Sequence, residues 1–178
     1  MEEGKSNRHY NNQRTVGVWL TYIGVIIILS AYLGGDLFIQ PVIMGFGYFF
    51  GYFLIFGLPY VNKKLSYGEN SKFQNRMDNF SILFTIILCT LVGLLIGFED
   101  LRLLWLCILI VIGIHFYGFY FSQGKIMLLL GTLTLVNSIL GIYLISVPFL
   151  VFAVIDGMIK ITIGCKMLLL KQQLSSPQ

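Results

Sequence analysis

Charged residues are scarce in this chain, at 11% of its 178 residues, whereas soluble domains carry about 25%. Hydrophobic residues make up 57% before glycine is counted. A soluble domain of this length has no interior large enough to bury so much apolar surface, so lipid must solvate much of it. The composition therefore excludes an ordinary soluble protein, and the length allows a single domain.

Cysteine motifs and enzyme motifs are also missing. The three cysteines, Cys89, Cys107 and Cys165, lie in apolar segments, and the absence of CxxC argues against a zinc site or a disulfide framework. We expect buried thiols packed among helices. The chain has no GxSxG, HExxH or P-loop motif and no paired acids within an apolar segment. We therefore expect no catalytic residue, no metal and no cofactor, and predict that the protein is not an enzyme.

Six apolar segments are present, each long enough to cross a bilayer as a helix. We predict an all-α polytopic membrane protein with six transmembrane helices in one compact bundle, in which three helical hairpins are one possible organisation. The chain divides into a polar tail (1–15), spans at about 16–33, 40–60, 80–98, 103–121, 126–147 and 149–170, and a second tail (171–178).

The longest predicted loop, Val61 to Asn79, is polar and basic. We expect it to set the topology, because basic loops stay on the cytoplasmic side of a membrane, and specific lipid or protein recognition is the alternative. The loop does not indicate a nucleic-acid site. Asp78 or Asn79, at the end of this loop, is expected to cap the third span.

Basic residues favour one side of the predicted membrane. Six spans put both termini on the same side, with ten basic residues, and leave only Arg102 on the other side, beside Asp36, Glu99 and Asp100. Cytoplasmic loops carry the excess of Lys and Arg. We therefore predict that both termini are cytoplasmic, in a bacterial cytoplasmic membrane. The ten residues are Lys5, Arg8, Arg14, Lys63, Lys64, Lys72, Arg76, Lys125, Lys166 and Lys171.

Small residues recur at helix-packing intervals within the spans. Because lipid offers no hydrophobic drive between helices, close approach through small residues takes over that role. Packing within one bundle is the simplest interpretation, and a homo-oligomer is the alternative. The candidate packing residues are Gly17, Gly24, Gly47, Gly51, Gly93, Gly97, Gly157 and Gly164.

Two opposite charges, Asp156 and Lys160, interrupt the sixth apolar segment. A charge at that depth costs roughly 2.5 to 3.5 kcal/mol on insertion scales. The i, i+4 spacing with the acid first favours a helical ion pair. Asn137 and His115 lie at a similar depth on the two preceding spans, so we predict a polar cluster of these four residues. Structural hydrogen bonding, proton or ion handling and a ligand pocket all remain open as its role.

The run VIDGMIKITIGCKML, with the short spans, tight outer turns and glycine-spaced hairpins, resembles small six-span bacterial membrane proteins. The chain is loosely similar to the acid-resistance membrane proteins of the HdeD type, whose later hairpins also carry a buried acid followed by glycine. It looks more like a separate uncharacterised family found mainly in Gram-positive bacteria. The resemblance covers the general layout and one hairpin, and it implies no activity.

Two function hypotheses follow. The first is a structural or stress-related membrane protein without turnover. The alternative is a small transporter or channel component that uses the buried Asp156 and Lys160 for proton or ion handling. The lipid bilayer is the expected partner in both.

Overall fold

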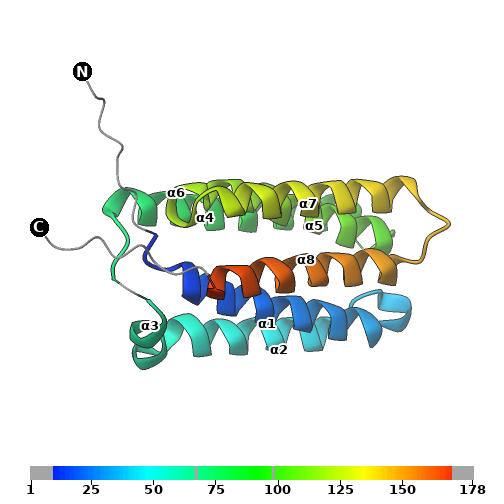
Figure 1. Cartoon of the computed structure of the whole chain (residues 1–178). Coiled ribbons are helices and arrows are strands. Elements are labelled where there is room, and N and C mark those ends of the chain that lie inside the picture. Colours follow the sequence, from blue (N-terminus) through cyan, green and yellow to red (C-terminus); the bar gives the residue numbers. More distant parts are fainter. Residues whose placement is uncertain (1–9, 67, 98, 170–178) are drawn as a thin grey trace, which may run out of the picture.

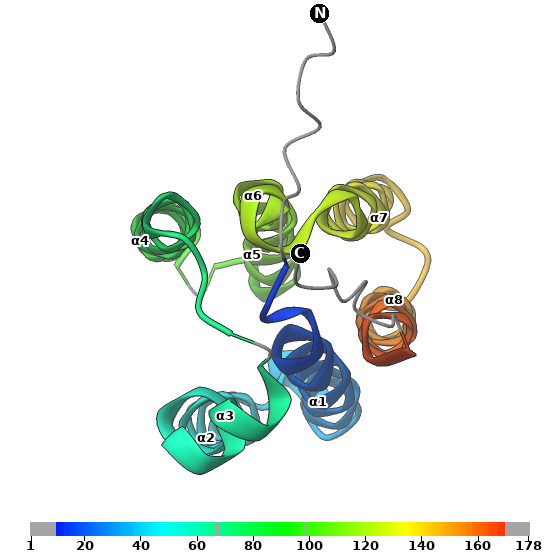
Figure 2. The same ribbon diagram turned by 60° about the vertical axis from the view of Figure 1, so that its left-hand side comes forward.

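The computed structural model describes residues 10–66, 68–97 and 99–169, and every regular element within these ranges is helical. Two layers of helices lie side by side along one long axis (Figure 1). Seen closer to end-on, α2, α1 and α8 form one layer, and α4, α5 and α7 form the other (Figure 2). The elements in chain order are α1 (Gln13–Tyr32), the 3-10 turn η1 (Gly35–Leu37), α2 (Pro41–Tyr52), the π-helical η2 (Phe53–Gly57), α3 (Pro59–Leu65), α4 (Lys72–Ile96), α5 (Leu101–Gly118), α6 (Tyr120–Gln123), α7 (Lys125–Tyr143) and α8 (Phe149–Leu169).

Four helices, α1, α4, α5 and α7, are long and apolar enough to cross a membrane. A fifth span results if the bent pair of α2 with η2 and α3 is counted as one. The last helix, α8, is 21 residues long, but Asp156, Lys160 and Lys166 interrupt its apolar character. The helices are compatible with a polytopic membrane protein, with four or five apolar candidate spans where the sequence predicts six.

The second predicted span is broken rather than continuous. Its helix passes into the π-helical turn η2, and at Leu58 the backbone is extended before α3 begins at Pro59. The two parts are bent by 71°. Proline disfavours the α conformation in the residue before it, so Pro59 explains why Leu58 leaves the helix. Part of the predicted loop from Val61 onwards is consequently helical.

The N-terminal cap of α4 differs from the prediction. Ser71 caps the helix, its hydroxyl accepting from the backbone N–H of Gln74 while the Gln74 side chain accepts from the backbone N–H of Ser71. This reciprocal pair satisfies two donors at once, which a lone acid at position 78 cannot do. The expectation that Asp78 or Asn79 caps the span was therefore wrong, and the helix begins two turns earlier.

The helix α1 packs most extensively against α8, although the two lie at opposite ends of the sequence. Two glycine pairs make this approach close. A Cβ atom at Gly24 would lie 2.6 Å from the carbonyl oxygen of Gly157, and one at Gly17 would lie 2.9 Å from that of Gly164. Any larger residue at these positions would push the two backbones apart.

The other candidate packing glycines behave in two ways. Gly47 and Gly51 bring α2 against α1, where the hydroxyl of Tyr22 donates to the Gly47 carbonyl at 2.8 Å. On α4, in contrast, no atom among the described residues lies within 4 Å of a Cβ placed at Gly93. Gly97 ends that helix with a φ of +58°, a conformation that favours glycine.

A further close contact joins α5 to α7. A Cβ atom at Gly131 would lie 2.7 Å from the carbonyl oxygen of Gly113. Both layers of the bundle thus contain a helix pair held together through glycine.

Several predictions fall on residues outside the described ranges. These are most of the first polar tail, the second tail from 171 to 178, and the last residues of the third and sixth predicted spans, Phe98 and Leu170.

Candidate functional site

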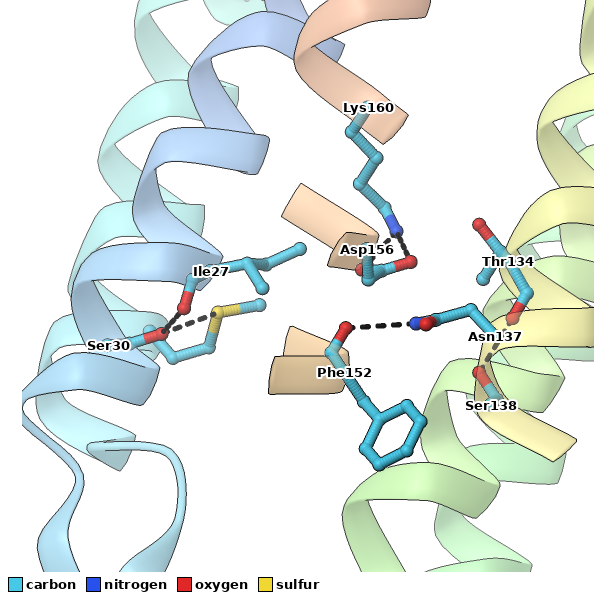
Figure 3. A network of polar contacts seen from close by, with 9 residues as sticks. Ile27, Ser30, Thr134, Asn137, Ser138, Phe152, Asp156 and Lys160 are labelled. Atoms are coloured by element: carbon cyan, nitrogen blue, oxygen red, sulfur yellow. Dashed lines mark hydrogen bonds and ion pairs between the residues drawn. The ribbon is translucent and has the colours of Figure 1, made fainter. Parts of the chain in front are cut away.

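The centre of α8 carries a buried ion pair. The Lys160 ammonium lies 2.6 and 2.5 Å from the two carboxylate oxygens of Asp156. The exposed fractions are 0% for Asp156 and 2% for Lys160, so neither charge meets the surface. Figure 3 shows the lysine side chain running back along the helix to the acid. The acid stands four residues before the base, the order in which a helix brings the two groups together.

Three other helices enclose this pair. The neighbouring residue Gly157 touches the backbone of α1 at Gly24, so the flank of α8 beside the pair is sealed. From α5, the ring of Phe116 lies 5.7 Å from the Lys160 ammonium. This contact lets an aromatic face stabilise the cation inside an apolar core. Buried side chains from α1, α5, α7 and α8 complete that core: Leu20, Phe116, Met127, Leu130, Ile163 and Met167.

From α7, Asn137 reaches the same region of α8. Its side-chain amide donates to the carbonyl of Phe152, one turn before Asp156, at 2.9 Å. This bond fixes the register of the two antiparallel helices and brings the next turn of α7, at Thr134, opposite the ion pair. Figure 3 shows Asn137 and Thr134 on the side of α7 that faces α8.

The hydroxyl of Thr134 is a distinctive polar group of this site. Thr134 is fully buried, and its hydroxyl has no hydrogen-bond partner among the described residues. Its backbone carbonyl, in contrast, accepts from the Ser138 hydroxyl at 2.8 Å. Buried polar atoms in proteins are nearly always paired. The buried, unpaired hydroxyl of Thr134 is therefore an unusual feature of the turn of α7 that lies opposite the ion pair.

The fourth predicted member, His115, lies apart from the pair. Its Nδ1 atom is 2.8 Å from the Thr85 hydroxyl and 3.0 Å from the Ser81 hydroxyl, both on α4. The Ser81 hydroxyl also donates to the His115 carbonyl at 2.8 Å. The structure thus brings together Asp156, Lys160 and Asn137, while His115 joins α5 to α4.

A family model for a family of unknown function, DUF6609, matches residues 3–177. The chain belongs to this family. No curated protein and no solved structure matches the chain.

Arg102, on the first turn of α5, makes polar contacts at the opposite end of the bundle from the described chain ends. The Arg102 guanidinium donates to the carbonyls of Gly141, Leu144 and Val147 at distances of 2.8 to 3.1 Å. Its cationic carbon also lies 5.7 Å from the ring centre of Phe152. A cation at a helix C-terminus is favourable, because the last carbonyls lack helical partners. In the sequence, Arg102 stands out as the single basic residue on the predicted non-cytoplasmic side, beside Asp36, Glu99 and Asp100.

The described part of the chain contains no cluster of side chains suited to binding a metal ion. Within those residues no group of three or more His, Cys, Asp and Glu side chains is placed to hold an ion. The cysteines are spread over three helices, with Cys89 and Cys107 half-buried and Cys165 exposed.

Proposed function

We propose that this chain is a six-span integral membrane protein of the bacterial cytoplasmic membrane, and that it acts as a structural component without catalytic turnover. In this proposal α8 is the sixth span. Its length of 21 residues corresponds to about 31 Å of helix, which matches the hydrocarbon core of a bilayer.

The buried ion pair is the observation that carries the proposal. Both carboxylate oxygens of Asp156 are engaged by Lys160, so α8 enters the bundle without a net charge at its centre. The glycine contacts with α1 then hold the charged flank away from lipid. A span built in this way stabilises the fold, and its charges do not need to reach water.

The distribution of basic residues supports cytoplasmic termini. Seven of the described basic residues lie at the end of the bundle where the described chain begins and ends (Figure 1). Arg102, on the first turn of α5, lies at the other end. An excess of Lys and Arg is typical of the cytoplasmic side. The seven residues are Arg14, Lys63, Lys64, Lys72, Arg76, Lys125 and Lys166.

A second candidate function is proton or ion handling, and one observation favours it. The unpaired Thr134 hydroxyl, on the turn of α7 opposite the pair, gives the site a polar group beyond the two charges. Ionisable residues within membrane spans also mark ion pathways in many transporters. In this case the pair would have to open to water during a cycle.

A flux measurement decides between the two candidates. The purified full chain in liposomes is given a pH gradient or an ion gradient, with empty liposomes for comparison. We expect equal decay of the gradient in both. The matched variants are Asp156→Asn and Asp36→Asn, since Asp36 is an exposed acid in the turn after α1. Flux above background that is lost in Asp156→Asn and kept in Asp36→Asn would establish the transporter instead.

A further inference from the structure

An open groove runs along the surface of the bundle between α7 and α8. Its volume is about 320 Å³. Apart from the hydroxyl of Thr162, its lining side chains are hydrocarbon or thioether. They come from Leu133 on α7 and from Val154, Ile155, Met158, Ile159, Thr162 and Ile163 on α8. We call this surface the α7–α8 groove.

The α7–α8 groove begins where the tight contact between the two helices ends. Near Phe152 the helices touch, because Asn137 donates to its carbonyl and a Cβ placed at Gly141 would lie 3.2 Å from its ring. The lining residues of the groove lie on the following turns of α8 and the preceding turns of α7, toward the end of the bundle where the described chain begins and ends. Large side chains on this surface, such as Met158, are exposed.

Two lysines lie beyond the lining residues of the groove, on the turns of α7 and α8 toward that end of the bundle. Lys125 opens α7, two turns beyond Leu133, and Lys166 lies two turns beyond Ile159 on α8. At about 1.5 Å per residue, each is roughly 10 to 12 Å past the middle of the groove. Because the helices are antiparallel with the register set by Asn137, both lysines lie at one level.

Both lysines are available to a ligand. Each is exposed, and neither forms an ion pair with any residue of the described ranges. Long lysine side chains lay their methylene groups along apolar surface and keep the ammonium in the polar interface. An apolar groove in the membrane, with two cations beyond one end of it, is therefore complementary to an amphiphile with an anionic head group.

We propose that the α7–α8 groove binds one acyl chain of an anionic phospholipid whose phosphate contacts Lys125 and Lys166. This rests on the proposed membrane placement, with the lysines at the level of the lipid headgroups. The acyl chain fills a surface that presents hydrocarbon and a single hydroxyl. The phosphate is attracted to two ammonium groups that form no ion pair with any of the described residues.

Native mass spectrometry of the purified full chain tests the proposal. The probes are phosphatidylglycerol and phosphatidylcholine with identical acyl chains, and glycerol 3-phosphate as the free headgroup. We expect phosphatidylglycerol to bind best and glycerol 3-phosphate not to compete with it. The double variant Lys125→Gln/Lys166→Gln should weaken phosphatidylglycerol binding roughly tenfold, because each headgroup lysine contributes an electrostatic attraction. The matched control Lys63→Gln/Lys64→Gln, which removes two exposed lysines of α3, should bind like wild type.

A groove-filling variant separates the acyl chain from the headgroup. Leu133→Trp places a large ring in the groove and should lower binding of both lipids. Equal binding of the two lipids by wild type would overturn the proposal, as would equal losses in the two lysine variants. Displacement of lipid by glycerol 3-phosphate would show a phosphate site that does not use the groove. Recovery of the chain in the soluble fraction would instead contradict the membrane placement, so the two failures are distinguishable.

Discussion

Asp156 and Lys160 satisfy each other within one turn of α8, with their side chains almost fully buried. Each charge alone would be costly in this buried, apolar position, because it would lose the partner that compensates it. The ring of Phe116 adds a further favourable contact to the cation. The energetic consequence is that the pair is tolerated as a unit, and either member without the other is not.

Replacing one charge should therefore harm the protein more than replacing both. Asp156→Asn or Lys160→Met leaves a buried charge unpaired, which should cost about 3 to 5 kcal/mol of stability. The double variant removes both charges and should be more stable than either single variant. Thermal unfolding in detergent, together with the yield of membrane-inserted protein, measures all three. Additive losses would show that the two groups do not act as a pair.

The ion pair could be predicted from the sequence because both residues lie on one helix, where a spacing of four fixes their geometry. The position of His115 could not be predicted in the same way. The neighbouring residue Phe116 lies beside Lys160, but successive helix residues point about 100° apart. Phe116 consequently faces Lys160, while His115 faces Ser81 and Thr85 of α4. Depth alone does not determine the face, and the face depends on tertiary packing.

Among the elements, the contact between α1 and α8 defines the bundle most strongly. Gly24 faces Gly157 and Gly17 faces Gly164, so that the backbones of the two helices approach directly. Van der Waals packing of this kind drives helix association in membranes. The same contact shields one flank of the ion pair, and the stability of the element and the burial of the charges therefore depend on the same glycines.

Adding one methyl group at this contact should be enough to disturb it. Gly24→Ala places a Cβ against the Gly157 carbonyl and should lower stability by about 1 to 3 kcal/mol, as overpacking does. The matched control is Gly93→Ala in α4, where no described atom lies within 4 Å of the new carbon. Gly93→Ala should leave stability unchanged or raise it, since alanine has a higher helix propensity than glycine. Thermal unfolding of both variants checks this, and equal effects would mean that the glycine contact does not hold α1 to α8.

The apolar segments of the sequence are largely helical, but the packing partner of each helix was harder to predict from the sequence. Sequential helices with short loops are usually adjacent, which points to α7 as the neighbour of α8. The helix that packs most extensively against α8 is α1, from the other end of the chain. A local sequence pattern does not predict a pairing between such distant segments. The cap of α4 is a different case. The spacing of Ser71 and Gln74 is that of a capping box. The apolar run begins only at Phe80, and for that reason the cap was predicted at Asp78 or Asn79.

At the scale of the whole molecule, the described chain is a two-layer helical bundle whose described ends lie together (Figure 1). Basic residues gather at that end, and Arg102 binds three backbone carbonyls at the other. The apolar composition and the long apolar segments were sufficient to predict an all-helical fold, and the apolar helices are compatible with a membrane protein. The number of spans is less clear from composition. Four or five helices are apolar enough to cross a membrane, whereas α8 carries Asp156, Lys160 and Lys166.

The central claim is that α8 crosses the membrane as a sixth span, with its charges paired inside the bundle. Labelling of single cysteines with a membrane-impermeant maleimide tests it most directly, in a variant whose Cys89, Cys107 and Cys165 are replaced by serine. Ser146→Cys lies in the exposed turn before α8, and Ser175→Cys lies beyond it, outside the described residues. We predict that Ser146→Cys is labelled in intact cells and Ser175→Cys only after the membrane is permeabilised. Labelling of both positions from the same side would contradict the six-span account.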